Sequence, residues 1–243
     1  QGLRQLAMGG TGTAWPWDAS TIFYNPGGLA RLKGIQAYGS MVFVMPSTAY
    51  GNRENSGTTS SNERTASQTF TPFSVYIGGR VSEYSRFGLG LGIYTPFGSG
   101  IKWDDNWIGK YMVQSIDLKT VFFQPTVSYR ANEWLSAGAG FVFATGSVDF
   151  RRALPVHGNG GADVDDGQAH LHGGATGVGF NVGVQMKASE KVQFGITWRS
   201  QVNMDVEGGT ANFTVPKSLR DSFPNTRFNS RLPLPGVYSV GVG

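Results

Sequence analysis

The sequence predicts an all-β chain that forms an antiparallel transmembrane β-barrel. Three observations predict this fold class: apolar residues alternate with polar or small ones, long and short connections alternate along the chain, and the composition is unusual for a soluble protein. Charged residues are 15% of the 243 residues and aromatic residues 13%, and there are 36 glycines. Soluble domains have about 25% charged residues. Low charge with abundant aromatic residues and glycine is typical of a sheet that faces lipid on one side.

Strict alternation is the strongest of these signals. Between residues 192 and 198 every second residue is apolar, and the residues between them are polar or small. Because successive side chains of a strand point to opposite faces, such a segment has one apolar face and one polar face. Strong or weak forms of this pattern predict eight strands, at residues 38–44, 73–77, 87–93, 121–129, 135–143, 178–186, 192–204 and 236–243.

The connections between these strands alternate in length. Long ones cover residues 46–68, 99–117, 151–168 and 207–234, and short ones cover residues 81–85, 131–133 and 188–191. This pattern predicts up-and-down hairpins whose long loops all lie at one end. Barrels of the bacterial outer membrane have short periplasmic turns and long extracellular loops in this way.

Three residues in or beside the predicted strand 121–129 carry further expectations, and Pro125 lies on its apolar face. Pro125 lacks an N–H group, so we expect either a bulge there or a position where the missing donor falls between hydrogen-bonding sites. Tyr129 and Trp134 flank the turn at residues 131–133, and we expect them in an aromatic girdle at the periplasmic interface, rather than only packing on their neighbours.

Several classes of function are excluded. The chain has no cysteine, which excludes disulfides, thiolate zinc sites and a cysteine nucleophile. There is no apolar run of the about 18 residues that a transmembrane helix needs, and no basic run with interleaved aromatics for nucleic acid. We find no credible catalytic set and no cofactor motif, so we expect no enzyme and no cofactor. Asp163, Asp165 and Asp166 lack calcium-loop spacing, and His170 and His172 lack a third ligand, so we expect no metal site.

A short stretch near the N-terminus resembles a family signature. Residues 18–32, with the turn Asn25-Pro26-Gly27, resemble the signature of the FadL-type outer-membrane channels, which carry hydrophobic molecules such as long-chain fatty acids. Residues 94–111 are similar to the end of the family's third strand and the loop after it, and residues 117–140 to its fourth strand and the segment that follows. The three patches occur in the family's order.

The resemblance implies a barrel of about fourteen strands with an N-terminal hatch inside it. Residues 1–34 then form the hatch and residues 35–243 form strands 1 to 8. Asn25, Pro26 and Gly27 are the gate of the hatch, with Gly27 where the family more often has alanine. Eight strands alone would close a barrel filled by its own side chains, without room for a hatch. We therefore interpret the chain, which starts at Gln1 without a visible signal peptide, as a mature or trimmed N-terminal portion of a longer protein.

The resemblance also implies a mechanism. Pro96 cannot donate to a ladder, and Gly98 and Gly100 cannot fill space, so with Phe97 they are expected to kink the third strand. In the family this kink opens a lateral gap next to the hatch, through which a hydrophobic ligand diffuses into the lipid. Transfer of apolar surface from water to lipid yields about 25 cal/mol per Å². Lateral exit therefore needs no energy input.

The loop after this kink is expected to collect the ligand. Trp103, Trp107 and Met112 are the candidates for an extracellular groove, with the alternative that the loop aromatics pack on each other or on lipid headgroups.

The sequence therefore predicts a multi-pass protein of the Gram-negative outer membrane that takes up hydrophobic molecules. Its partners are a fatty-acid-like small molecule and membrane lipid, with no nucleic acid. Alternatives are a FadL-like subunit or shuttle of a protein secretion assembly, a compact eight-stranded membrane enzyme or adhesin, and a soluble β protein, which the apolar stripes argue against. The sequence does not distinguish a fatty acid from an aromatic hydrocarbon as ligand.

Overall fold

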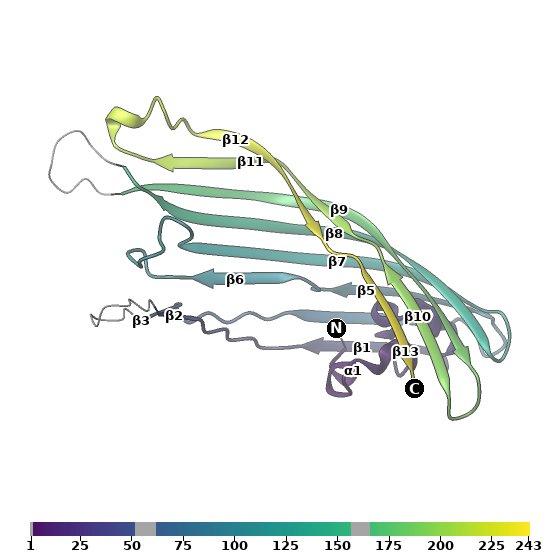
Figure 1. Ribbon diagram of the computed structural model, residues 1–243. Coiled ribbons are helices and arrows are strands. Elements are labelled where there is room, and N and C mark those ends of the chain that lie inside the picture. The colour runs from purple at the N-terminus through teal and green to yellow at the C-terminus, as the bar shows by residue number, and fades with distance from the viewer. Residues whose placement is uncertain (1, 52–61, 157–165) are drawn as a thin grey trace.

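The computed structural model describes residues 2–51, 62–156 and 166–243. Its main feature is one curved antiparallel sheet that wraps around the N-terminal segment (Figure 1). Eight strands follow one another across this sheet, each hydrogen-bonded to the next. They are β1 (Ile35–Met41), β4 (Phe73–Arg80), β5 (Phe87–Tyr94), β7 (Ser115–Arg130), β8 (Leu135–Leu154), β9 (Gly167–Lys187), β10 (Gln193–Arg199) and β13 (Val237–Val242).

Shorter elements extend this sheet or precede it. Three strands continue it at the end with the long connections: β6 (Gly98–Lys102) beside β7, β11 (Val202–Thr214) beside β9, and β12 (Thr226–Leu234) beside β11. A separate hairpin pairs β2 (Ala49–Gly51) with β3 (Asn62–Arg64). The helices are α1 (Leu3–Ala7), η1 (Thr11–Thr13), α2 (Thr21–Tyr24), η2 (Pro26–Arg31) and η3 (Lys217–Leu219).

The exposed and buried residues of the strands are the reverse of those in a soluble protein. Large apolar side chains point outward, with Ile196 60% exposed and Phe141 54% exposed. The alternating polar residues, among them Gln124, Asn181 and Gln185, are completely buried on the inner face. Soluble proteins bury the apolar set and expose the polar set. The outer face therefore suits an apolar surrounding, which confirms the transmembrane fold class and contradicts the soluble alternative.

Each predicted strand has its counterpart in this sheet, but the structure divides the predicted strand 192–204 between β10 and β11. β7, β8 and β9 are longer than the alternation predicted. β8 and β9 stay in register from Leu135↔Met186 to Leu154↔Gly167. The predicted loops 46–68 and 207–234 contain strands β2, β3 and β12, and β6 overlaps the start of the predicted loop 99–117. The physical reason is that backbone pairing continues beyond the apolar band, where the outward residues are polar and leave no alternating pattern. In the described residues β1 and β13 do not pair with each other, so the eight strands do not close a compact barrel.

The register between β7 and β8 also shows which of the two expectations for Pro125 holds. Phe123 pairs with Phe143 and Thr126 with Gly140, so the β7–β8 register passes Pro125 without a shift. This excludes the bulge and leaves the alternative in which the missing donor falls between bonded positions. Beside the adjacent short turn, Tyr129 is 40% exposed and Trp134 is 52% exposed. Both are accessible from the outer face, as a girdle would require.

Candidate functional site

Asn25 joins the N-terminal segment (residues 2–34) to the inner face of the sheet. It caps η2, since its side-chain oxygen accepts from the Gly27 N–H at 3.0 Å, and Pro26 occupies the first helical position. Its Nδ2 donates to the Thr13 carbonyl at 2.7 Å and to the Val184 carbonyl of β9 at 3.0 Å. The side chain is completely buried. The three predicted gate residues thus form one turn pressed against the wall.

Glycines on the inner face let this turn approach the strands. A Cβ added at Gly138 would overlap the Pro26 carbonyl, one at Gly183 would overlap the Asn25 side chain, and one at Gly195 would overlap the Thr13 carbonyl. The backbone of the segment therefore lies directly on the backbone of β8, β9 and β10. A larger side chain at these positions is incompatible with this contact.

Polar side chains of the wall satisfy the carbonyl groups of α2. This helix has four residues, so its carbonyls have few partners within it. Gln124 Nε2 donates to the Ile22 carbonyl at 2.7 Å, and Asn181 Nδ2 donates to the Phe23 carbonyl at 3.1 Å. Arg199 Nη2 donates to the Phe23 carbonyl at 2.6 Å, and its guanidinium lies 3.8 Å from the centre of the Phe23 ring. The sequence placed these wall residues on the polar face but did not single them out.

We expect Asn25→Asp to release the N-terminal segment from the wall. The carboxylate would face two carbonyl oxygens in a buried site and could donate to neither, at a cost of about 3 kcal/mol. A cysteine replacing the buried Ala19 can report this, because the chain has no other thiol. We expect maleimide labelling about a hundredfold faster, the factor that corresponds to this energy.

Asn132→Asp is the matched control for this prediction. The Asn132 side chain only accepts, from the Trp134 and Leu135 N–H groups, and a carboxylate accepts equally well. In the Asn132→Asp variant, a cysteine at position 19 should react with maleimide at the same rate as in the protein with Asn132. Equal labelling in both variants would show that the Asn25 bonds do not hold the segment in place.

An extra residue interrupts the third membrane strand at the predicted kink. Tyr94 of β5 pairs with Phe122, and Gly98 of β6 pairs with Lys119, so three residues (95–97) lie opposite two of β7. An extra residue reverses the alternation of faces. Tyr94 and Phe97 accordingly both point inward, and Phe97 packs against Phe122 with ring centres 6.1 Å apart.

The wall opens on the other side of this kink. The β4–β5 pairing ends where the Thr95 N–H donates to the Phe73 carbonyl at 3.0 Å, and further along the Ala66 N–H donates to the Lys102 carbonyl at 2.7 Å. Between these two bonds, no backbone hydrogen bond joins residues 67–72 to residues 96–101 in the described structure. Residues 70–72 instead pair with residues 42–44 of the neighbouring strand.

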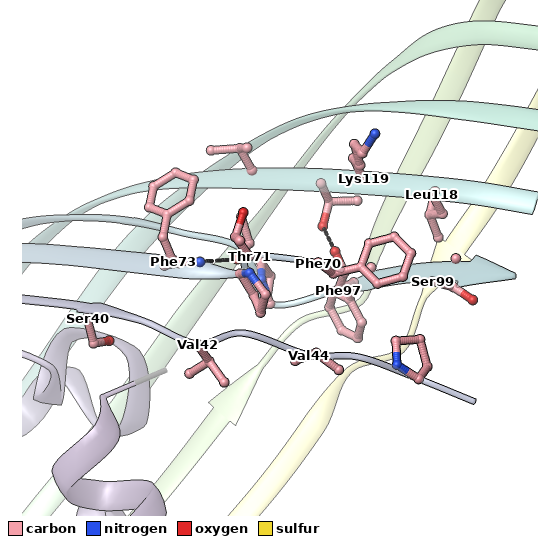
Figure 2. A pocket seen from close by; sticks show the side chains of 18 of the residues that line it. Ser40, Val42, Val44, Phe70, Thr71, Phe73, Phe97, Ser99, Leu118 and Lys119 are labelled. Carbon is pink, nitrogen blue, oxygen red and sulfur yellow. Dashed lines mark hydrogen bonds between the residues drawn. The ribbon is translucent and has the colours of Figure 1, made fainter. Parts of the chain in front are cut away.

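A cavity of about 740 Å³ occupies this opening (Figure 2). All four predicted kink residues, Pro96, Phe97, Gly98 and Gly100, line it. Its lining includes Val42 from the inner face and Val121 from the outer face. The cavity thus borders both faces of the sheet, as a passage through the wall would.

The loop after the kink buries two of the three candidate groove residues. Trp103 and Trp107 are only 5% and 8% exposed, which agrees with the alternative that the loop aromatics pack on each other. They stack with ring centres 4.1 Å apart, and Tyr50 packs edge-on against Trp107. Large aromatic rings in a loop gain more by covering one another than by facing water. Met112 is 78% exposed and remains available to a groove.

The residues that we discounted as metal ligands are arranged as follows. Asp163 and Asp165 lie outside the described residues. Asp166 pairs with Lys110 at 2.5 Å and accepts from the Tyr111 hydroxyl at 2.8 Å, and this bonding raises the pKa of both Lys110 and Tyr111. His170 Nε2 lies 2.7 Å from Asp149. Nowhere in the described ranges do three histidine or carboxylate groups gather as metal ligands would.

A search of the helices gives a separate result. Within residues 2–51, 62–156 and 166–243, no helix has the length and apolar character needed to cross a membrane.

Comparison with known proteins gives a family match and several relatives. Residues 1–239 match the family described as "Outer membrane protein transport protein (OMPP1/FadL/TodX)". The chain is 23% identical over 255 residues to a long-chain fatty acid transport protein of Escherichia coli O6:H1, covering 95% of the chain and 55% of that protein. It is 26% identical over 212 residues to a putative outer membrane protein of Neisseria meningitidis, covering 79% of the chain and 46% of that protein. The chain therefore spans about half the length of these curated relatives.

Solved structures share the fold. A FadL homologue of Pseudomonas aeruginosa superimposes with a TM-score of 0.72 at 19% identity, covering 96% of this chain and 62% of that one. The toluene transporter TbuX of Ralstonia pickettii superimposes with a TM-score of 0.70 at 16% identity, covering 100% of this chain and 67% of that one.

Proposed function

The chain belongs to the outer membrane protein transport protein family (OMPP1/FadL/TodX), and on that premise we propose that it takes up hydrophobic molecules by lateral diffusion through the opening at the kinked third strand. In this proposal the protein lies in the outer membrane of a Gram-negative cell. Residues 1–34 act as a hatch inside the barrel, and residues 35–243 provide its first eight membrane strands. The described residues contain no feature that favours the alternative of a secretion subunit.

The observation that carries the proposal is the cavity between the two edges of the wall. It has about 740 Å³, within the range of about 300–1,000 Å³ that small-molecule sites occupy. Its lining is apolar or uncharged except for Lys119, whose Nζ pairs with Asp117 at 2.7 Å. A hydrophobic molecule can occupy such a site without desolvating an unpaired charge.

The energetics favour exit into the membrane. A molecule with about 300 Å² of apolar surface is about 7 kcal/mol more stable in lipid than in water. The hatch, held by the hydrogen bonds of Asn25 and Gln124, stands between the inside of the sheet and the periplasmic turns. A ligand that follows the cavity to the outer face therefore reaches lipid without crossing water, and diffusion suffices.

We propose as substrates a long-chain fatty acid or an aromatic hydrocarbon such as toluene, the compounds named in the descriptions of the relatives. The test is uptake of radiolabelled oleate and toluene by cells that lack their own transporters and express the complete protein. We expect at least one probe to accumulate faster than in cells with the empty vector. Uptake equal to the vector for both probes, with the protein present in the outer membrane, would contradict the proposal.

A further inference from the structure

Phe70 reaches across the opening in the wall. Its backbone is fixed to the β1 side, because its N–H donates to the Val44 carbonyl at 2.9 Å and its carbonyl accepts from the Val44 N–H at 2.8 Å. Its ring lies on the β6 side, where a Cβ added at Gly100 would overlap it. Figure 2 shows Phe70 beside Phe97 and near Val44, within the cavity.

The alternation of faces shows how the two edges meet. Phe70 pairs with Val44, which belongs to the inward set of β1 with Tyr38, so the Phe70 side chain points inward. Gly100 of β6 pairs with Asp117 of β7, and both residues have the outward direction. The Phe70 ring therefore lies between the inner face of one edge and the outer face of the other, where the two edges overlap.

Of the three phenylalanines that line the cavity, Phe70 and Phe97 differ in how firmly they are held. Phe97 packs against Phe122 and the buried core of the inner face, and its carbonyl accepts from the Thr120 hydroxyl at 2.5 Å. Phe70 is half-buried and lies outside this core cluster. Its neighbour across the opening is a glycine, which offers no side chain to lock the ring. The Phe70 ring can therefore turn aside with less loss of packing than the Phe97 ring.

We propose that the Phe70 ring is the side-chain gate of the lateral opening and sets the width of the molecules that pass through it. The inference rests on the proposed function, since a gate needs a passage. With the ring across the opening, it lies against Gly100, and the small residues Gly98 and Ser99 line the same cavity. With the ring turned aside, these small residues leave a continuous path from the inner to the outer face.

Phe70→Ala tests the gate through selectivity. Cells that express the complete protein receive radiolabelled oleate and a wider probe, a pyrene-tagged dodecanoate. We expect the ratio of pyrene-probe uptake to oleate uptake to rise about tenfold, the lower range of what one apolar group contributes to discrimination. Phe70→Trp should lower the ratio. Phe43→Ala is the matched control, because Phe43 is 63% exposed on the outward face of the neighbouring segment, and it should leave the ratio unchanged.

A reversible label tests the gate in correctly folded molecules. The chain has no cysteine, so Phe70→Cys introduces a single thiol among these 243 residues. A bulky methanethiosulfonate reagent should reduce the uptake of both probes, and dithiothreitol should restore it. If the wild type takes up oleate, but every variant has the same probe ratio and the label has no effect, the role of Phe70 as a gate is overturned and the proposed function is not. Absence of uptake of oleate, the pyrene probe and toluene by the wild type would overturn the proposed function.

Discussion

Deletion of Pro96 is expected to reduce the uptake of hydrophobic molecules to the level of cells without the protein. Tyr94 pairs with Phe122 and Gly98 with Lys119, so this strand advances four residues while β7 advances three. Removing one residue makes the number of residues between these two pairs the same on both strands. β5 and β6 can then form one regular strand, with Phe97 still pointing inward, and β6 can align with the residues before β4. The opening closes because no residue remains to produce the kink.

Pro96→Ala is the control for this deletion. It restores a backbone donor but keeps the extra residue, so the opening and most of the uptake should remain. Oleate and toluene uptake is measured in cells with matched amounts of each variant, and the heat-dependent shift in gel mobility reports a folded barrel. A folded deletion variant that takes up both probes like the wild type would show that the kink is not the route.

The fold could be predicted because the lipid-facing pattern is local in sequence. Alternation such as that of residues 192–198 needs no knowledge of partners, since each strand must present apolar residues to lipid. The ends of the strands could not be predicted in the same way. Arg151 pairs with His170 in the β8–β9 ladder, and neither residue carries an alternating apolar signal. Pairing there depends on the neighbouring strand, not on the segment itself.

The site could be predicted in part for a similar reason. Proline and glycine mark a kink directly, and Pro96 and Gly100 both line the cavity. The importance of Phe70 depends on a contact with a residue thirty positions away, which no local pattern reveals. Likewise, Asn181 looks like any inward polar residue until the carbonyls of α2 are seen to be its partners. The burial of Trp103 and Trp107 depends on the path of a loop.

Gly138→Val is expected to displace the proposed hatch, residues 1–34, and make the outer membrane permeable to large polar molecules. A Cβ at this position would overlap the Pro26 carbonyl group and the Gly27 nitrogen, which are backbone atoms that cannot rotate away. The N-terminal segment must then move off the wall. Its displacement also breaks the hydrogen bonds that Asn25 and α2 make to β9 and β7. The overlap alone costs about 1–3 kcal/mol, and the lost bonds add to it.

The matched control lies one residue away on the same strand. Ala137 is exposed on the outward face, so Ala137→Val places the same valine side chain toward lipid and should leave the N-terminal segment in place. Growth inhibition by vancomycin, which an intact outer membrane excludes, is the measurement. We expect Gly138→Val cells to become sensitive and Ala137→Val cells to remain resistant. In the proposed mechanism the plug and the lateral exit have separate roles. If Gly138→Val cells become sensitive to vancomycin but still take up oleate, the hatch excludes water-soluble molecules and the kink provides the route for hydrophobic ones. Resistance in both variants, with both proteins folded in the membrane, would contradict the role of residues 1–34 as a plug.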